Sequence, residues 1–223
     1  MRTAADLGVR GFEAIDLATR GERLALFHGR TRYNKQPGAF VVENLVIAEL
    51  DADGRVAAEI LFGTDDTDAA MAELDARYLA GEAAAHAATW SAIVNANAAF
   101  NRREMPKTTP DWVNIDHRRG GTAFAPGEQA AFMRATWDVA PQISNRIVAV
   151  HRLCDRGVVF TQLVHATSRE GFNGEWRDVV VMTVDGDAID RCEVYDDGEL
   201  AAAIARFDEL GATSSGSSAP ASP

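Results

Sequence analysis

The sequence is poor in the features that mark several common classes of protein. Its 223 residues include only two cysteines, Cys154 and Cys192, and neither belongs to a Cys-x-x-Cys pair or a Cys/His cluster. Two isolated thiols argue against a disulfide framework and suit a reducing compartment. No apolar run approaches the roughly 18 residues that suggest a membrane span, and the first residues lack the apolar core of a signal peptide. We therefore expect a cytoplasmic protein.

Positive charge is also scarce. The chain has 22 Lys and Arg residues against 33 Asp and Glu, which gives a net charge of −11. A surface with this much negative charge repels phosphate backbones and anionic lipid headgroups. We therefore expect neither nucleic acid nor a membrane as a partner. Apolar residues make up 47% of the chain, an ordinary globular composition, and the length is sufficient to bury a core.

The common sequence signatures of metal, nucleotide and nucleophile sites are missing. The chain has no His-x-x-x-His or His-Glu-x-x-His spacing, no Walker loop, no Gly-x-Gly-x-x-Gly and no Gly-x-Ser-x-Gly. The acidic runs 65–68 and 196–199 invite a calcium interpretation, but both precede expected helices, where carboxylates cap the helix N-terminus. We expect no metal and no cofactor.

What the chain does have is a strong pattern of strands. Val, Ile, Phe and Thr are concentrated in short runs separated by turns rich in Gly, Asp and Asn, which is typical of antiparallel hairpins. The predicted strands are 12–17, 22–30, 40–50, 56–62, 111–118, 143–153, 157–168, 175–184 and 188–195. Apolar residues at helical spacing predict helices at 66–79, 84–102, 126–139 and 198–210. Residues 211–223 have no apolar side chain larger than alanine, so we expect a disordered tail.

Part of this pattern occurs twice. Residues 45–51 match 179–185, and the strand and the helix that follow each of them also match, with Leu74 corresponding to Phe207. The chain therefore looks like two copies of a unit made of strands, an acidic helix start and a helix. Helices and a leading strand precede only the second copy. We expect a half-domain over residues 1–80 and a complete domain over residues 84–210.

These segments also resemble a known family. The run Phe100-Asn101-Arg102-Arg103, the strand 111–118, the helix opening at Gly127-Glu128 and the closing segments 189–197 and 203–210 resemble a SnoaL-like domain of the NTF2-like superfamily. The likeness covers residues 84–210 as a whole domain and 12–80 as the second half of another. The combination is also similar to modules at the C-terminal end of large bacterial regulatory and cyclase proteins.

The resemblance implies an α+β fold in which a curved antiparallel sheet and packed helices form a cone. A pocket lies in the cone of such domains, and a dimer face lies on the back of the sheet. A half-domain would leave apolar surface uncovered. We therefore expect residues 12–80 to pack against a complete domain, within the chain as a pseudo-dimer or from a second chain as a homodimer.

Members of the superfamily with known activities include polyketide cyclases, ketosteroid isomerases, dehydratases and epoxide hydrolases, which place a carboxylate or a histidine in the apolar cone. Here the last strand presents Ile189, Arg191, Glu193 and Tyr195 on one face. If that face lines the cone, Glu193 is a candidate base, and Arg191 and Tyr195 orient the substrate or donate to an oxyanion. Alternatively, Arg191 and Glu193 form an ion pair in water or at an interface, and Tyr195 packs.

Two further residues are candidates for acid–base chemistry. Asp116 shares a strand face with Trp112 and Asn114, whereas the adjacent His117 points the opposite way. His165 is either a hydrogen-bonded core histidine or a pocket base. The aromatic and amide side chains expected to bind a ligand, together with Arg191, are Trp90, Asn97, Trp112, Phe132 and Trp137.

No complete acid–base set is visible. We therefore expect a non-catalytic small-molecule-binding or assembly module, with a hydrophobic small molecule as its ligand. The alternative is a small lyase, isomerase or hydrolase that acts on a hydrophobic cyclic substrate by general acid–base chemistry. Two or more ionisable groups converging on a closed apolar cavity would favour the enzyme.

Overall fold

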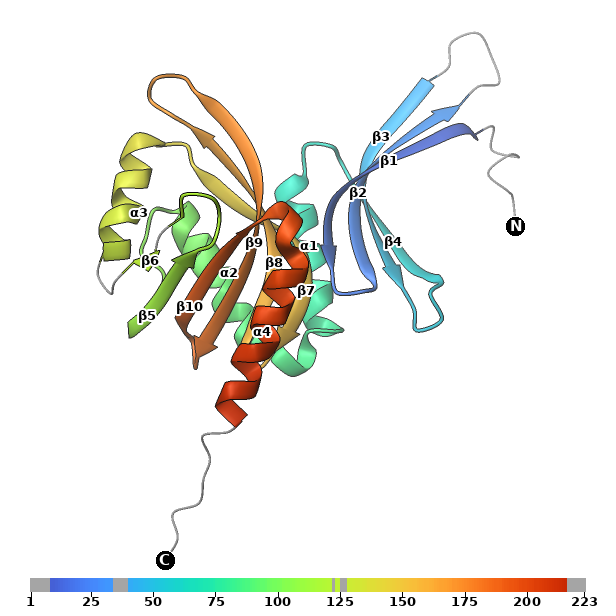
Figure 1. Ribbon diagram of the computed structural model, residues 1–223. Coiled ribbons are helices and arrows are strands. Elements are labelled where there is room, and N and C mark those ends of the chain that lie inside the picture. The colour runs from blue at the N-terminus through green and yellow to red at the C-terminus, as the bar shows by residue number, and fades with distance from the viewer. Residues whose placement is uncertain (1–8, 34–39, 122, 125–127, 216–223) are drawn as a thin grey trace, which may run out of the picture. The chain divides into compact units, whose positions relative to one another are not determined.

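The computed structural model describes residues 9–33, 40–121, 123–124 and 128–215 (Figure 1). The chain divides into two compact units, which we call unit 1 (Met1–Glu82) and unit 2 (Ala83–Pro223). This division lies within a few residues of the boundary predicted between the half-domain and the complete domain.

Unit 1 is an antiparallel meander followed by one helix. Its strands pair in sequential order, and α1 packs on β1, β2 and β3. Leu26 and Ile47 of the sheet and Leu74 of the helix are fully buried, and Arg20 forms an ion pair of 2.7 Å with Asp75 of α1. The elements are β1 (Val9–Arg20), β2 (Leu24–Tyr33), β3 (Phe40–Leu50), β4 (Val56–Phe62) and α1 (Thr67–Ala80). The predicted bounds of β3 and β4 are confirmed.

The face of this sheet opposite α1 is rich in aromatic side chains. Phe12 contacts Phe27 edge to face, with ring centroids 6.0 Å apart, and Tyr33 stacks on Phe40 at 4.8 Å. Phe27 and Tyr33 alternate along β2 with the buried Leu26, so they point away from α1. Phe12, Phe40 and Leu61 are each more than half exposed. Among the described residues of unit 1, no helix covers this face.

Unit 2 combines helices with a mixed sheet, so the predicted α+β class is confirmed. Its strand order is β6-β5-β10-β9-β8-β7, and all neighbours are antiparallel except β5 and β10. The expected antiparallel sheet is therefore confirmed at every pair but this one, where β5, which is reached through a long connection, runs parallel to β10. The elements are η1 (Ala84–His86), α2 (Ala87–Asn101), β5 (Thr108–Asp116), β6 (Ala123–Phe124), α3 (Glu128–Val139), β7 (Ser144–Cys154), β8 (Gly157–Thr167), β9 (Asn173–Asp185), β10 (Ala188–Asp196), η2 (Asp197–Glu199) and α4 (Leu200–Ser215).

Helices cover both faces of this sheet. α2 packs on β7 to β10, and α4 packs on β8 to β10. Figure 1 shows α4 in front of the sheet and α2 behind it. The side under α4 is a closed apolar cluster formed by Val159, Val179, Val181, Tyr195, Ala203 and Phe207. We call this the α4 face, and the opposite side, under α2, the cavity face.

Several predicted element bounds need correction; for example, β1 extends over Val9–Arg20 where a strand at 12–17 was predicted. The prediction of a disordered tail is wrong for residues 211–215, because α4 continues to Ser215. Residues 216–223 lie outside the described residues. The predicted helix 84–102 begins as a 3-10 turn, and the predicted strand 111–118 starts earlier and ends at Asp116. Pro126 and Gly127, the expected start of α3, lie outside the described residues. The short β6 was not predicted.

Both units place consecutive antiparallel strands before a helix, β1 to β4 before α1 and β7 to β10 before α4. This is the order that a repeat would produce. The repeat itself stays a prediction.

Candidate functional site

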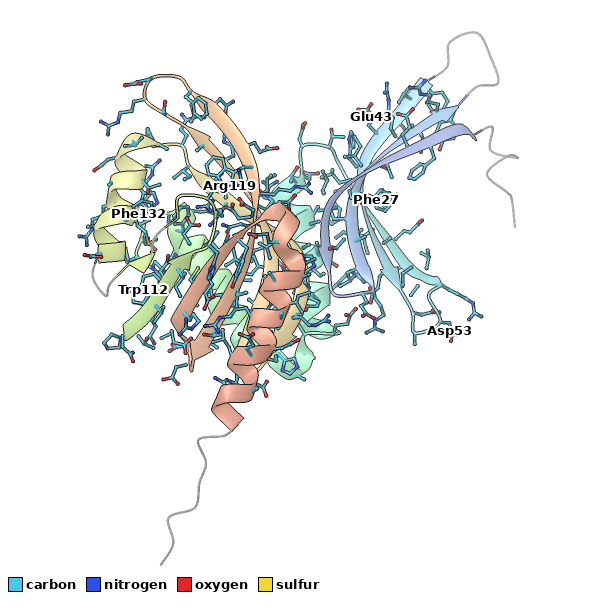
Figure 2. All side chains as sticks on the ribbon, viewed as in Figure 1. Phe27, Glu43, Asp53, Trp112, Arg119 and Phe132 are labelled. Carbon is cyan, nitrogen blue, oxygen red and sulfur yellow. The ribbon has the colours of Figure 1, made fainter. Side chains whose placement is uncertain are left out.

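Unit 2 contains a cavity of about 290 Å³ between α2, α3 and the cavity face of the sheet. Its walls are mostly aliphatic and aromatic because β8, β9 and β10 present alternate apolar residues on this side. The contributing strand residues include Phe160, Val180 and Val194. Trp112 from β5 and Phe132 from α3, which are labelled in Figure 2, complete the aromatic lining.

One part of the wall carries a charged cluster. Arg118 follows β5 and donates from Nη1 to Oδ1 of Asp178 at 2.8 Å, while Trp176 Nε1 donates to Oδ2 at 3.1 Å. Arg118 also binds Asp116 through Nε and Nη2, at 2.9 and 2.7 Å. Asp178 is only 4% exposed. Both oxygens of the one carboxylate that lines the cavity, among the described residues, are therefore engaged by protein donors.

The charges in this cluster are mutually stabilised. The hydrogen bond from Arg118 is the largest influence on Asp116 and lowers the pKa of that carboxyl, although partial burial opposes it. The same bond raises the pKa of the Arg118 guanidinium. Asp116 is therefore ionised at neutral pH and is poorly suited to accept a proton.

Carboxamides supply most of the remaining polarity of the cavity. Asn145 Nδ2 donates to Gln162 Oε1 at 3.3 Å, and Asn101 Nδ2 donates to Asn97 Oδ1 at 3.4 Å. Asn114 also lines the wall. Amides offer both donors and acceptors without net charge, so the cavity is polar in places but close to neutral.

A second polar network lies on the α4 face and is centred on Glu193, which is fully buried. Its Oε2 accepts hydrogen bonds from His117 Nε2 at 2.8 Å and Tyr195 Oη at 3.0 Å. Its Oε1 accepts from Arg191 at 2.9 Å, and Arg206 of α4 reaches both oxygens at 3.2 Å. The rings of His117 and Tyr195 stack with centroids 4.3 Å apart. The network thus ties the end of β5, the strand β10 and α4 together.

This arrangement changes the role expected for Glu193. Burial raises the pKa of its carboxyl, but hydrogen bonds from His117, Tyr195 and Arg191, with the positive charge of Arg206, outweigh burial and lower the pKa overall. Burial, followed by the bond to Glu193, raises the pKa of Tyr195. Glu193 is therefore a fixed anion of the structure and not a poised base.

The face of β10 that carries Glu193 does not line the cavity, contrary to our expectation. Cys192 and Val194 line it instead, and Arg191, Glu193 and Tyr195 alternate with them. Ile189 was expected to share the face of Glu193 but lies on the cavity side, because the ladder is irregular between Ile189 and Arg191. An extra residue in a strand reverses the alternation beyond it.

The other predicted residues divide between the two sides of the sheet. Asn97, Trp112 and Phe132 line the cavity, and Asp116 contacts it through Arg118. His165 belongs to β8 but alternates with the lining residues Gln162 and Val164, so it points away from the cavity. Trp90 and Trp137, which we also expected to bind a ligand, are buried but do not line the cavity.

Sequence reasoning missed the pair that dominates the cavity wall, Arg118 and Asp178. A signal for Asp178 was present, because an acidic residue precedes the run Val179-Val180-Val181 inside a strand expected to be buried. A charged residue next to such a run is rarely buried without a partner. The identity of that partner depends on a contact between residues sixty positions apart.

Burial also affects the thiol on this wall. Enclosure by protein, followed by the negative charges of Glu193, Asp116 and Asp178, raises the pKa of Cys192 to about 12. The thiol therefore stays protonated.

Within the described ranges, no three His, Cys, Asp or Glu side chains gather in an arrangement that could hold a metal ion. No helix in these ranges is both long and apolar enough to cross a lipid bilayer.

Comparison with known proteins gives matches to solved structures. No family model and no curated protein matches the chain. A protein from Jannaschia sp. CCS1 described as a SnoaL-like polyketide cyclase is 14% identical, with a TM-score of 0.43, over 61% of this chain and 96% of its own. A protein from Catenulispora acidiphila with a ketosteroid isomerase-like fold is 14% identical, with a TM-score of 0.41, over 50% and 89%.

An uncharacterised cystatin-fold protein from Novosphingobium aromaticivorans is 19% identical, with a TM-score of 0.40, over 48% of this chain and 97% of its own. The solved structures similar to parts of this chain thus include a protein described as a SnoaL-like polyketide cyclase and proteins of ketosteroid isomerase-like or cystatin fold.

Proposed function

We propose that unit 2 is a non-catalytic module that binds a small molecule in its cavity. The observation that carries this proposal is the state of Asp178, the carboxylate on the cavity wall. Arg118 and Trp176 already engage its two oxygens. The other carboxylates considered as bases, Glu193 and Asp116, have lowered pKa values and do not line the cavity. An acid–base enzyme instead needs a group poised to exchange a proton with its substrate.

The lining favours a compact, neutral, amphipathic ligand. A volume of about 290 Å³ is at the lower end of the range of about 300–1,000 Å³ seen for ligand pockets. Aromatic side chains such as Trp112 and Phe132 provide apolar contact, while amides such as Gln162 provide hydrogen bonds at fixed points. The guanidinium of Arg118 and both oxygens of Asp178 already have protein partners, so neither side chain is free for an ionic ligand.

Filling the cavity tests this proposal. Ala96 of α2 lines the cavity and is 9% exposed, so Ala96→Phe places a ring where the ligand would lie. We expect N-phenyl-1-naphthylamine, a neutral fluorescent probe, to bind the variant at least about tenfold more weakly, which corresponds to about 1.4 kcal/mol. Ala202→Phe, at an exposed position on α4, is the matched control. Equal binding by both variants, once circular dichroism shows both folded, would refute the proposal.

A second candidate function rests on the burial of Asp178. A carboxylate that is 4% exposed and faces a cavity could accept a proton if a substrate displaced Arg118 or Trp176. The test is exchange of the α-protons of 2-tetralone with D₂O, followed by NMR. Exchange by the wild-type protein that disappears in Asp178→Asn would favour an acid–base enzyme over the binding module.

We also propose that residues 12–80 are stabilised by packing against a complete domain of the same type, within the chain or from a second chain. The exposed aromatic face of unit 1, with Phe12 and Phe40, supports this. We expect a fragment of residues 84–215 to have a lower urea midpoint than the whole chain. All four tryptophans lie in this fragment, so their fluorescence reports the same unfolding in both proteins. A monomeric fragment with an unchanged midpoint would rule the idea out.

A further inference from the structure

Asn114 differs from the other amides of the cavity because its side chain has no hydrogen-bond partner among the described residues. It is 8% exposed. Its backbone lies opposite Cys192 of β10 on one side and Phe124 of β6 on the other. A residue flanked by strands on both sides is closed to water from the sheet edge, so its remaining exposed surface faces the cavity that it lines.

An unpaired carboxamide in this position is unusual. Most polar side chains in protein interiors are hydrogen-bonded within the protein or to water, whereas the polar atoms of Asn114 are unpaired but not fully buried, so they keep accessible surface on the cavity side. The neighbour Cys192 compensates poorly, because its thiol stays protonated and is a weak donor and acceptor. By contrast, Asn97 and Gln162 each hydrogen-bond another amide, and Asn145 does so through Nδ2, although its Oδ1 is buried without a partner. Asn114 is thus left with a free donor and a free acceptor that point into the cavity.

The chemistry of a carboxamide defines what would complement it. Its N–H and C=O lie side by side in one plane, so a ligand with an adjacent acceptor and donor forms two parallel hydrogen bonds with it. A ring that holds C=O next to N–H, a cis-lactam, has this geometry with both groups available. A hydroxyl beside a carbonyl matches less well, because its O–H already donates to its own carbonyl. The cis-lactam is also neutral, as the cavity requires.

We propose that Asn114 selects the ligand of this cavity and that the ligand is a neutral, planar ring system with a cis-lactam edge. This inference rests on the proposed binding function. Trp112, two residues earlier on the same face of β5, also lines the cavity and provides an aromatic wall beside the lactam site.

The test compares two probes in the full-length protein by isothermal titration calorimetry. 2-Quinolone carries the lactam N–H and C=O, and 1-methyl-2-quinolone is nearly the same size without the N–H. We expect the wild-type protein to bind 2-quinolone about ten- to a hundredfold more tightly, because the methylated probe leaves the Asn114 acceptor unpaired. Asn114→Leu, which is similar in size and apolar, should abolish this preference. Asn95→Leu, at an exposed position on α2 that does not line the cavity, is the matched control and should keep the preference.

Each outcome of this test is decisive. A wild-type protein that binds both quinolones equally would overturn the role of Asn114 and leave the binding function standing. Preference retained by Asn114→Leu, shown to be folded by circular dichroism, would do the same. Failure of the wild-type protein to bind either quinolone or N-phenyl-1-naphthylamine would overturn both proposals. The comparison of the two quinolones in the wild-type protein holds even if the variant does not fold.

Discussion

Replacing Glu193 with Gln is expected to lower the free energy of unfolding of unit 2 by about 2–3 kcal/mol. Removing one partner from a buried ionic network typically costs about 3–5 kcal/mol, because the remaining charges lose their counterion. The lower figure applies here because the side chains of Arg191 and Arg206 are 25% and 35% exposed, so water partly compensates them. Gln keeps the size of Glu, so the effect reports charge and hydrogen bonding and not packing.

Urea unfolding followed by tryptophan fluorescence measures this loss, since all four tryptophans belong to unit 2. Glu175→Gln, at an exposed position on β9, is the control and should change stability by less than about 0.5 kcal/mol. The pKa of Glu193 is lower in the folded protein than in the unfolded chain, where it is about 4.3. The ionised carboxylate therefore stabilises the fold at pH values above about 4.3, and this stabilisation is lost as the pH falls through the pKa of the folded protein. The difference between wild type and variant should therefore shrink below about pH 4. A difference that is independent of pH would contradict the assignment.

Arg118→Met is expected to destabilise unit 2 by about 3 kcal/mol. The substitution leaves Asp178, whose side chain is 5% exposed, without the guanidinium that neutralises it, and leaves Asp116 without its main partner. Methionine retains much of the length of the arginine side chain. The measurement is again the urea midpoint by tryptophan fluorescence. Arg177→Met, at an exposed position on β9, is the matched control.

The pH dependence of this variant provides an independent check. Hydrogen bonding by Arg118 lowers the pKa of Asp116 in the folded protein. In the unfolded chain the pKa of an aspartate is about 3.9. Near this pH the unfolded chain therefore binds more protons than the folded protein does. Wild-type stability should therefore fall as pH drops below about 4, and the fall should be shallower in Arg118→Met. An unchanged slope would show that the pair contributes little to the acid sensitivity of the unit.

Much of the fold could be predicted because it depends on local pattern. The strands β3 and β4 were placed at their observed bounds, since β-branched and other apolar residues are concentrated there and Asp and Gly mark the turn between them. The direction of β5 and the irregularity after Ile189 could not be predicted. Both depend on how distant strands meet, and periodicity along one strand carries no information about that.

The site was harder to predict for the same reason. The alternation of Arg191, Glu193 and Tyr195 correctly identified a polar face of the last strand, but a period of two does not say which face looks into a cavity. The structure places that face under α4. Trp112 and Phe132 were recognised because aromatic residues on apolar faces are common in pockets. The pairing of Arg118 with Asp178 and the unpaired state of Asn114 exist only once the chain is folded.

The parallel pairing of β5 with β10 determines when unit 2 can be completed during synthesis. The ribosome makes β5 early in this unit and β10 near its end, so β5 has no neighbour on that side until the other strands have been made. Unit 1 differs, because each of its strands can join the one just made. Strand β5 therefore waits for this neighbour until most of unit 2 has been made, and long-range pairing of this kind slows folding and leaves a strand edge open to aggregation until it forms.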